Sequence, residues 1–255
     1  MQRIVFDKGN ESLEEIIEKI TSQETPTEEV SHSSNVDLSD VPFAHLHNHS
    51  QFSVLQSTTK IDAIVDKAAS MEMPAVALTD YSNLYGAFHF VDAIYKHPIN
   101  QDAIEHNNKI SQGEVESEIK QLPLKGIVGC ELSICKDHLD HSQKDNGRGI
   151  VFLAKNKQGY HNLAKMSSIA FVDGFYYVPR IDKTIVNQYK EGLIALSGGL
   201  KGEISDLILT VGEKQAEDAL LWWKEQFADD FYIELVRHGL EEEKRVNETL
   251  LKFAK

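Results

Sequence analysis

The sequence predicts an α/β fold in which short strands recur with helical connections between them. Two observations support this prediction. From Pro42 onward, short apolar runs alternate with stretches whose apolar residues recur at helical spacing. The chain has 255 residues, of which 41% are apolar and 26% are charged, so it can bury the core of one large domain. Wholesale disorder is therefore excluded.

The expected elements follow in order along the chain. We expect strands at the apolar runs 43–49, 74–80, 124–135, 149–155, 192–198 and 231–237. We expect helices at 60–71, 83–97, 158–170, 201–209, 213–227 and 241–255. The polar stretch 98–121 is predicted to be a loop or a short surface helix, and 137–148 a turn-rich insertion. Strands joined by helices favour a parallel sheet, open or closed into a barrel, with active groups at the carboxyl ends of its strands.

Charge is distributed unevenly. The whole chain carries 26 − 40 = −14, and ten acidic against three basic residues in the first 40 account for −7 of it. Residues 1–41 are therefore interpreted as an acidic leader, with one short helix at 13–20 and a polar linker after it. The domain of residues 42–255 carries the other half of the excess negative charge. This charge argues against binding of nucleic acid by the domain alone.

The chain has no features of secretion or of a membrane span. Its N-terminus lacks the basic-then-apolar order of a signal peptide, and no apolar run approaches 18 residues. A cytoplasmic location is expected. The two cysteines, Cys130 and Cys135, fall in one predicted strand and are expected to be reduced core residues.

The clearest chemical pattern is the alternation of His45, His47 and His49. Side chains two apart on a strand share a face, so these imidazoles converge near the carboxyl end of their strand. Imidazole is a preferred ligand of zinc, iron and manganese, and the pattern therefore predicts a metal site. The alternative is a polar strand edge with no ligand.

Further polar residues stand at the ends of other predicted strands. Asp80 is expected to cap the following turn, and Ser197 precedes a Gly-Gly turn. Glu131 lies inside an otherwise apolar strand, so it is either a metal ligand or half of an inward salt bridge. On the amphipathic helix 213–227, at least one of Trp222 and Trp223 is expected in the core, and His238 is expected to cap a helix.

Several motifs, in order and spacing, resemble a known family. They are FAHLHNHSQFSVLQS, MPAVALTDYSNLYGAFHF, KGIVGCEL, GIVFLAKNKQGYHNLAKMSS and LIALSGGLKGEI. Over residues 42–255 they resemble the PHP (polymerase and histidinol phosphatase) domain of the bacterial DNA polymerase III alpha subunit. The resemblance implies a distorted seven-stranded β/α barrel, here cut short before its last metal motif. It also implies a site that, where intact, holds up to three divalent ions.

Carried over residue by residue, the resemblance implies an eroded metal site. His47, His49 and Glu131 match three family ligands. The other four positions that can be compared hold residues that are poor ligands or have no side chain to offer: Gln56, Tyr81, Gly149 and Gly199. A cluster of three ions is therefore not expected. His47, His49 and Glu131 are expected to hold at most one weakly bound divalent ion, zinc or manganese, and no catalytic residue is assigned.

The functional expectation is the PHP portion of a replicative polymerase subunit with a mainly structural role. Its implied partners are the polymerase core of the same parent chain and a proofreading exonuclease, with DNA contacted only through the parent. Nucleotidyl transfer would belong to the parent, because no polymerase palm lies in these residues. The alternative is an independent metal-dependent phosphoesterase or 3′–5′ exonuclease of the same family.

Overall fold

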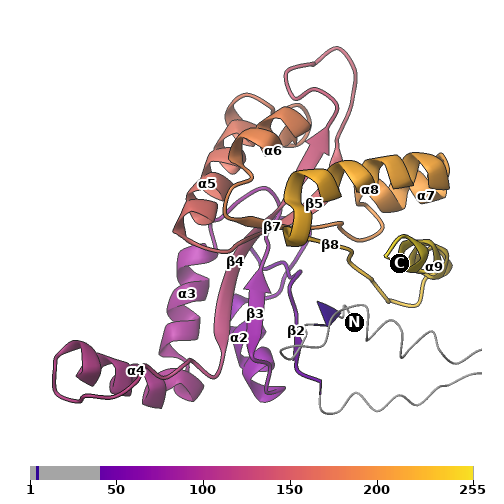
Figure 1. The fold of residues 1–255 in the computed structure, drawn as a ribbon. Helices are drawn as coiled ribbons and strands as arrows, with labels where there is room; N and C mark the ends of the chain where they lie inside the picture. The colour runs from indigo at the N-terminus through magenta and orange to yellow at the C-terminus, as the bar shows by residue number, and fades with distance from the viewer. Residues whose placement is uncertain (1–3, 6–40, 255) are drawn as a thin grey trace, which may run out of the picture.

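The computed structural model describes residues 4–5 and 41–254, and it has a mixed α/β architecture (Figure 1). Its strands are β1 (Ile4–Val5), β2 (Phe43–Ala44), β3 (Ala75–Leu78), β4 (Lys125–Cys135), β5 (Arg148–Ala154), β6 (Arg180–Asp182), β7 (Leu193–Leu196) and β8 (Phe231–Tyr232). Its helices are α2 (Ile61–Ser70), α3 (Ala87–Lys96), α4 (Pro98–Ser111), α5 (Lys157–Val172), α6 (Lys183–Tyr189), α7 (Glu203–Thr210), α8 (Glu213–Phe227), the 3₁₀ turn η1 (Ala228–Asp230) and α9 (Glu241–Phe253). The α/β prediction is confirmed, whereas the helix predicted at 13–20 lies outside the described residues.

The main sheet is mixed rather than parallel. Its strands lie in the order β3-β4-β5-β7-β8, and β6 pairs with the last residues of β4. β3–β4, β4–β6 and β7–β8 are parallel, but β4–β5 and β5–β7 are antiparallel. The chain returns from β4 to β5 through the turn-rich insertion without a crossover helix, and such a connection produces an antiparallel pair.

Within the described residues the sheet does not close into a barrel. At one edge, the chain after β2 runs along β3, where the Ala77 N–H donates to the His45 carbonyl (2.8 Å) and the Thr79 N–H to the Asn48 carbonyl (2.8 Å). At the other edge, β8 pairs with β7 alone. The strands predicted at 43–49 and 231–237 are each only two residues long, so little backbone pairing is available to join these edges. β1, which falls in the predicted leader, pairs antiparallel with β2.

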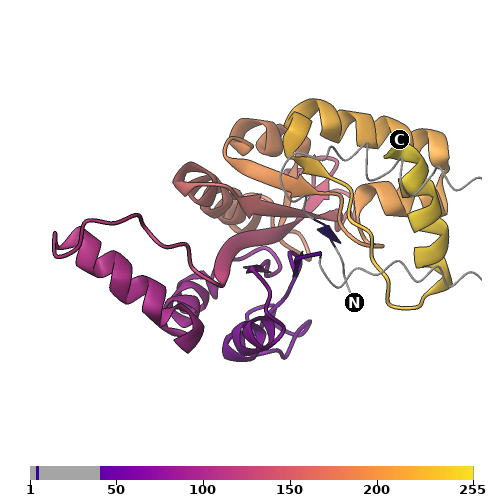
Figure 2. The same ribbon diagram turned by 60° about the horizontal axis from the view of Figure 1, so that its bottom comes forward.

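Alternation along the strands sorts the side chains between two faces. Helices α5, α6, α7, α8 and α9 lie over one face of the sheet (Figure 2). Between them and the sheet is a large apolar cluster around Trp223, which is fully buried, as expected for one of the two tryptophans. The opposite face of the central strands carries a small cluster: Ala44, Leu46, Ala77, Val151, Leu153 and Leu196. Cys130 and Leu132 belong to the large cluster, so Glu131 between them points to the other face.

Two features were not predicted in their observed form. The polar stretch 98–121 contains the long helix α4, which projects from the body of the fold (Figures 1 and 2). His97 caps it by accepting from the Ile99 N–H, and the buried side chain of Asn100 donates to the Ile94 and Leu124 carbonyls. The short strand β6 and helix α6 were missed, although Asp182 is a clear cap for α6, accepting from Thr184 and Ile185.

Both cysteines are free and buried, as expected. The Cys135 thiol lies 3.2 Å from the Ile181 carbonyl on β6. No helix among the described residues is long and apolar enough to cross a membrane.

A fully buried arginine fixes the insertion between β4 and β5. The Arg180 guanidinium donates to the carbonyls of Gly174, Asp145, His138 and Asp140. Because these carbonyls come from two separate loops, one side chain on β6 orders both. A planar group with five donors in a fixed fork suits this task.

Replacing Arg180 by methionine should destabilise the fold markedly. The change leaves several carbonyls without their donor, and a loss of about 3 kcal/mol or more is expected. Urea denaturation measures the effect. The matched control is Arg148→Met, because Arg148 is 42% exposed and pairs with the partly exposed Asp206, so its loss should cost less than about 1 kcal/mol. Equal effects of the two changes would contradict the role given to Arg180.

Candidate metal centre

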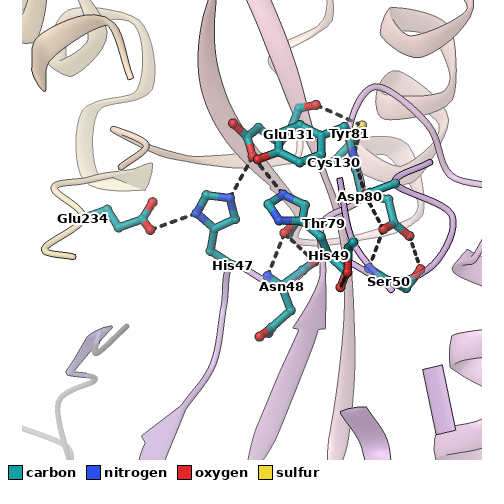
Figure 3. A network of polar contacts seen from close by, with 12 residues as sticks. His47, Asn48, His49, Ser50, Thr79, Asp80, Tyr81, Cys130, Glu131 and Glu234 are labelled. Carbon is teal, nitrogen blue, oxygen red and sulfur yellow. Dashed lines mark hydrogen bonds and ion pairs between the residues drawn. The ribbon is translucent and has the colours of Figure 1, made fainter. Parts of the chain in front are cut away.

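Four side chains from three separate parts of the chain meet beside the open edges of the sheet (Figure 3). His47 and His49 follow β2, Glu131 lies in the middle of β4, and Glu234 follows β8. The structure thus brings together the three predicted site residues and adds Glu234, which was not predicted. His45 lines the same cleft, but its ring packs edge-on against Phe43.

Glu131 is the hub of this site. Its Oε2 atom lies 2.9 Å from Nε2 of His47 and 2.9 Å from Nε2 of His49, so a single carboxylate oxygen serves both imidazoles. The carboxylate is almost fully buried, and it comes from a strand whose neighbouring residues pack in the apolar core. A carboxylate in such a place must be paired, and here two histidines provide the pairing.

Burial and pairing act in opposite directions on the pKa values. Burial alone would raise the pKa of Glu131, but hydrogen bonds from His47 and His49 outweigh it and lower the pKa to about 2. Burial alone would lower the pKa of His47, but the charges of Glu234 and Glu131 and hydrogen bonds to both raise it to about 10. In the absence of a metal, the site is therefore held by charge-assisted hydrogen bonds.

Glu234 completes the contacts of His47. Its Oε1 lies 2.8 Å from Nδ1 of His47, and the side chain is fully buried. Ser197 Oγ accepts from the Glu234 backbone N–H (2.9 Å), which fixes the start of the segment after β8. Glu234 sits in the apolar run FYIELVR, so the argument that singled out Glu131 in its strand would also have identified Glu234.

Asp80 organises the loop that follows the histidines. Its carboxylate accepts from the Ser50 N–H (2.6 Å), the Ser50 hydroxyl (2.8 Å) and the Ser53 hydroxyl (2.7 Å). The role of Asp80 is structural, as expected, but its carboxylate fixes the loop after His49 instead of the turn that follows Asp80 itself. Thr79 also holds the segment that carries the histidines, because its Oγ1 accepts a hydrogen bond from the Asn48 N–H (2.9 Å).

The four positions predicted to lack family ligands lie around this site in different ways. Gln56 and Gly199 line the cleft, and Tyr81 stacks on His49 with ring centroids 4.0 Å apart. Burial and the Glu131 carboxylate raise the pKa of the Tyr81 hydroxyl to about 12. Gly149 lies against Glu131 itself, and a Cβ atom added there would collide with Glu131 Oε1. The Glu131 carboxylate occupies the space that a side chain at position 149 would fill.

A cleft of about 490 Å³ opens over this site. Lys201 and Leu200 from the turn before α7 form part of its wall, and His238 and Glu243 form another part. His238 pairs with Glu243 (2.7 Å), and Glu243 also accepts from the backbone N–H groups of Gly239 and Leu240 at the start of α9. His238 therefore takes part in the capping of a helix, the role expected for it.

The donor atoms fit a single divalent ion. His47, His49 and Glu131 each offer one donor atom, and these three atoms lie within 4.8 Å of one another. Two imidazoles with one carboxylate are a common ligand set for zinc. Manganese accepts the same donor types. The only other such group among residues 4–5 and 41–254 is Asp137, His138 and Asp182, where Asp182 already pairs with His138 (2.5 Å) and caps α6.

Comparisons with known proteins place this chain beside one family. The model of the PHP domain family matches residues 45–238. Proteins named DNA polymerase III subunit alpha match from Borreliella burgdorferi (39% identity over 84% of this chain), Chlamydia trachomatis (37% over 78%) and Treponema pallidum (34% over 85%). This chain spans only 17%, 14% and 17% of their lengths. A solved structure from Bifidobacterium adolescentis, regarded as a metal-dependent phosphoesterase, is a more distant likeness, with a TM-score of 0.44 and 12% identity over 83% of this chain and 84% of that one.

Replacing Gly149 by alanine should destabilise the chain, because the new methyl group would fall on Glu131 Oε1 and displace the carboxylate from His47 and His49. A loss of roughly 1–3 kcal/mol is expected for such overpacking. The matched control is Gly199→Ala in the wall of the same cleft, where the nearest atom to an added Cβ is Val236 Cγ2 at 3.3 Å. Chemical denaturation should show a clear loss for the first variant and little for the second; the reverse order would contradict this packing.

The pH dependence of stability should reveal the site. The raised pKa of His47 means that its contribution is complete below pH 6.5 and is lost as the pH rises toward about 10. The lowered pKa of Glu131 means that its contribution is complete above pH 4.5 and is lost as the pH falls toward about 2. The difference in unfolding free energy between wild type and His47→Gln should therefore be largest near pH 4.5–6.5. A difference that grows steadily from pH 6.5 to 10 would be incompatible with this network.

Proposed function

Because this chain belongs to the PHP domain family, we propose that it is the PHP portion of a DNA polymerase III alpha subunit. In this proposal residues 42–255 form the domain, and residues 1–41 form an acidic leader. The support is that the relatives described above all carry that name and match over 78–85% of this chain. Each relative is several times longer, so DNA synthesis belongs to the longer parent protein.

The proposed role of the domain is structural, with an eroded metal site. One observation carries this proposal: the Glu131 carboxylate is engaged by His47 and His49 and fills the space beside Gly149. A group used in this way links chain segments without any ion. With Gln56, Tyr81, Gly149 and Gly199 at the other positions that can be compared, the residues that the structure describes supply donors for one ion at most at this site, zinc or manganese. The two-metal clamp that would stabilise both attacking and leaving oxygens of a phosphodiester is then missing.

The partners in this proposal follow from charge and from length. The described domain is acidic, so it has little electrostatic reason to hold DNA by itself, and DNA would be contacted through the rest of the parent protein. The polymerase core of the same chain would be the main partner, with a proofreading exonuclease as a second one. The setting would be the cytoplasm, where bacterial DNA is replicated.

A second candidate function is metal-dependent phosphoester hydrolysis, either of a small ester or of a DNA 3′ end. The observation in its favour is the cleft of about 490 Å³ over His47, His49 and Glu131, with Lys201 in its wall. An ammonium group beside a metal site is suited to an anionic phosphate. This function requires a tightly bound ion that activates water.

The two functions differ in what the purified chain does with single-stranded DNA. Incubated with Mn²⁺ or Zn²⁺, the chain should cleave DNA no faster than its His47→Ala variant, because a structural site supports no turnover. Elemental analysis of the protein as purified should give less than about one ion per chain. Robust cleavage that His47→Ala abolishes, together with one bound ion per chain, would overturn the structural role and establish the hydrolase.

A further inference from the structure

We infer that Glu234 is a positioning residue that prepares His47 to bind a divalent cation together with His49 and Glu131. The inference rests on the single-ion site proposed above. It adds to that site Glu234, a residue that was not predicted from the sequence. Glu234 does not line the cleft. Of the three proposed ligands, it contacts only His47. It therefore acts on the cation through the imidazole.

The geometry around His47 carries the inference. Nδ1 of His47 faces Glu234 Oε1 at 2.8 Å, whereas Nε2 faces Glu131 Oε2 at 2.9 Å (Figure 3). To bind a cation, the His47 imidazole must be neutral, with one N–H and one lone pair. A hydrogen bond from Nδ1–H to Glu234 leaves the lone pair on Nε2, which is the nitrogen that points toward His49 and Glu131. Metal-binding histidines commonly donate their second ring N–H to a carboxylate in this way, which fixes the tautomer and makes the ligand more basic.

A cation would replace the two protons that now lie between the histidines and Glu131, one on each Nε2. The two N···O distances of 2.9 Å are those of hydrogen bonds, whereas donor atoms around a tetrahedral zinc ion lie about 3.3 Å apart. The donors therefore need to separate by a few tenths of an ångström.

The contact with His47 accounts for one oxygen of the Glu234 carboxylate, but fold stability gives no reason for the second oxygen. The side chain is fully buried, and its Oε2 atom has no hydrogen-bond partner among the described residues. A buried carboxylate with an unpaired oxygen costs free energy, and an apolar side chain of similar volume would avoid that cost. The negative charge of Glu234 is useful here only through its interaction with His47. That interaction is strongest when His47 binds a cation.

The test compares the wild-type chain with Glu234→Met, which keeps the volume and removes the acceptor. Calorimetric titration with Mn²⁺ and with Zn²⁺ should show one site in the wild type and an affinity lower by about 10–100-fold in Glu234→Met. Glu234→Gln, whose amide oxygen still accepts from Nδ1–H, should recover part of the loss. The matched control is Glu243→Gln, which alters the other histidine–carboxylate pair in the cleft and should leave the affinity unchanged.

A second readout is independent of any bound metal. In chelator-treated protein near pH 7, the ¹⁵N shifts of the His47 ring should show hydrogen on both ring nitrogens in the wild type, whereas Glu234→Met should lose the hydrogen on Nδ1 and keep the one on Nε2, which faces Glu131. Unchanged shifts and unchanged affinity in a folded Glu234→Met variant would overturn the inference. A wild-type chain that binds neither ion would also overturn it, yet would leave the proposed structural role of the domain intact.

Discussion

A single carboxylate oxygen, Glu131 Oε2, holds together the part of the fold where backbone pairing stops. The sheet has two edges, one at β3 with the segment after β2 beside it, and one at β8. His47 reaches from the first edge to Glu131 in the centre and to Glu234 beyond β8. Buried hydrogen bonds between charged partners are strong and cannot be exchanged for water without cost. The arrangement therefore makes a side-chain connection where strands provide none.

The surrounding residues maintain that connection. Asp80 fixes the loop after His49 through Ser50 and Ser53, and Ser197 fixes the backbone of Glu234. Gly149 leaves the space that the Glu131 carboxylate fills. The same four ionisable groups can serve as a proton-bonded link or as a one-ion site, because a proton and a cation compete for the same donor atoms. In the proposal made above, the structural and metal-binding roles are therefore two states of one cluster.

The sequence predicted what depends on local pattern. Glu131 was singled out because it is a carboxylate inside an otherwise apolar strand, and apolar spacing located α2 and α8 to within a residue or two. β6 and α6 were missed because three and seven residues are too short to show a period. The length of α4 was underestimated because few of its residues are buried, namely Asn100, Ala103 and Ile104. The pairing of His47 with Glu234, 187 residues away, depends on how the sheet bends, which no local pattern encodes.

The central claim is that His47 and Glu131 stabilise the fold together and without a metal. A double-mutant cycle with His47→Gln and Glu131→Gln, measured by urea denaturation at pH 6 with a chelator present, tests it directly. The account predicts that the two changes are strongly non-additive, with a coupling free energy of about 1.5 kcal/mol or more, as expected for a buried pair of charged hydrogen-bonding groups. A coupling within about 0.5 kcal/mol of zero, in variants that remain folded, would contradict it.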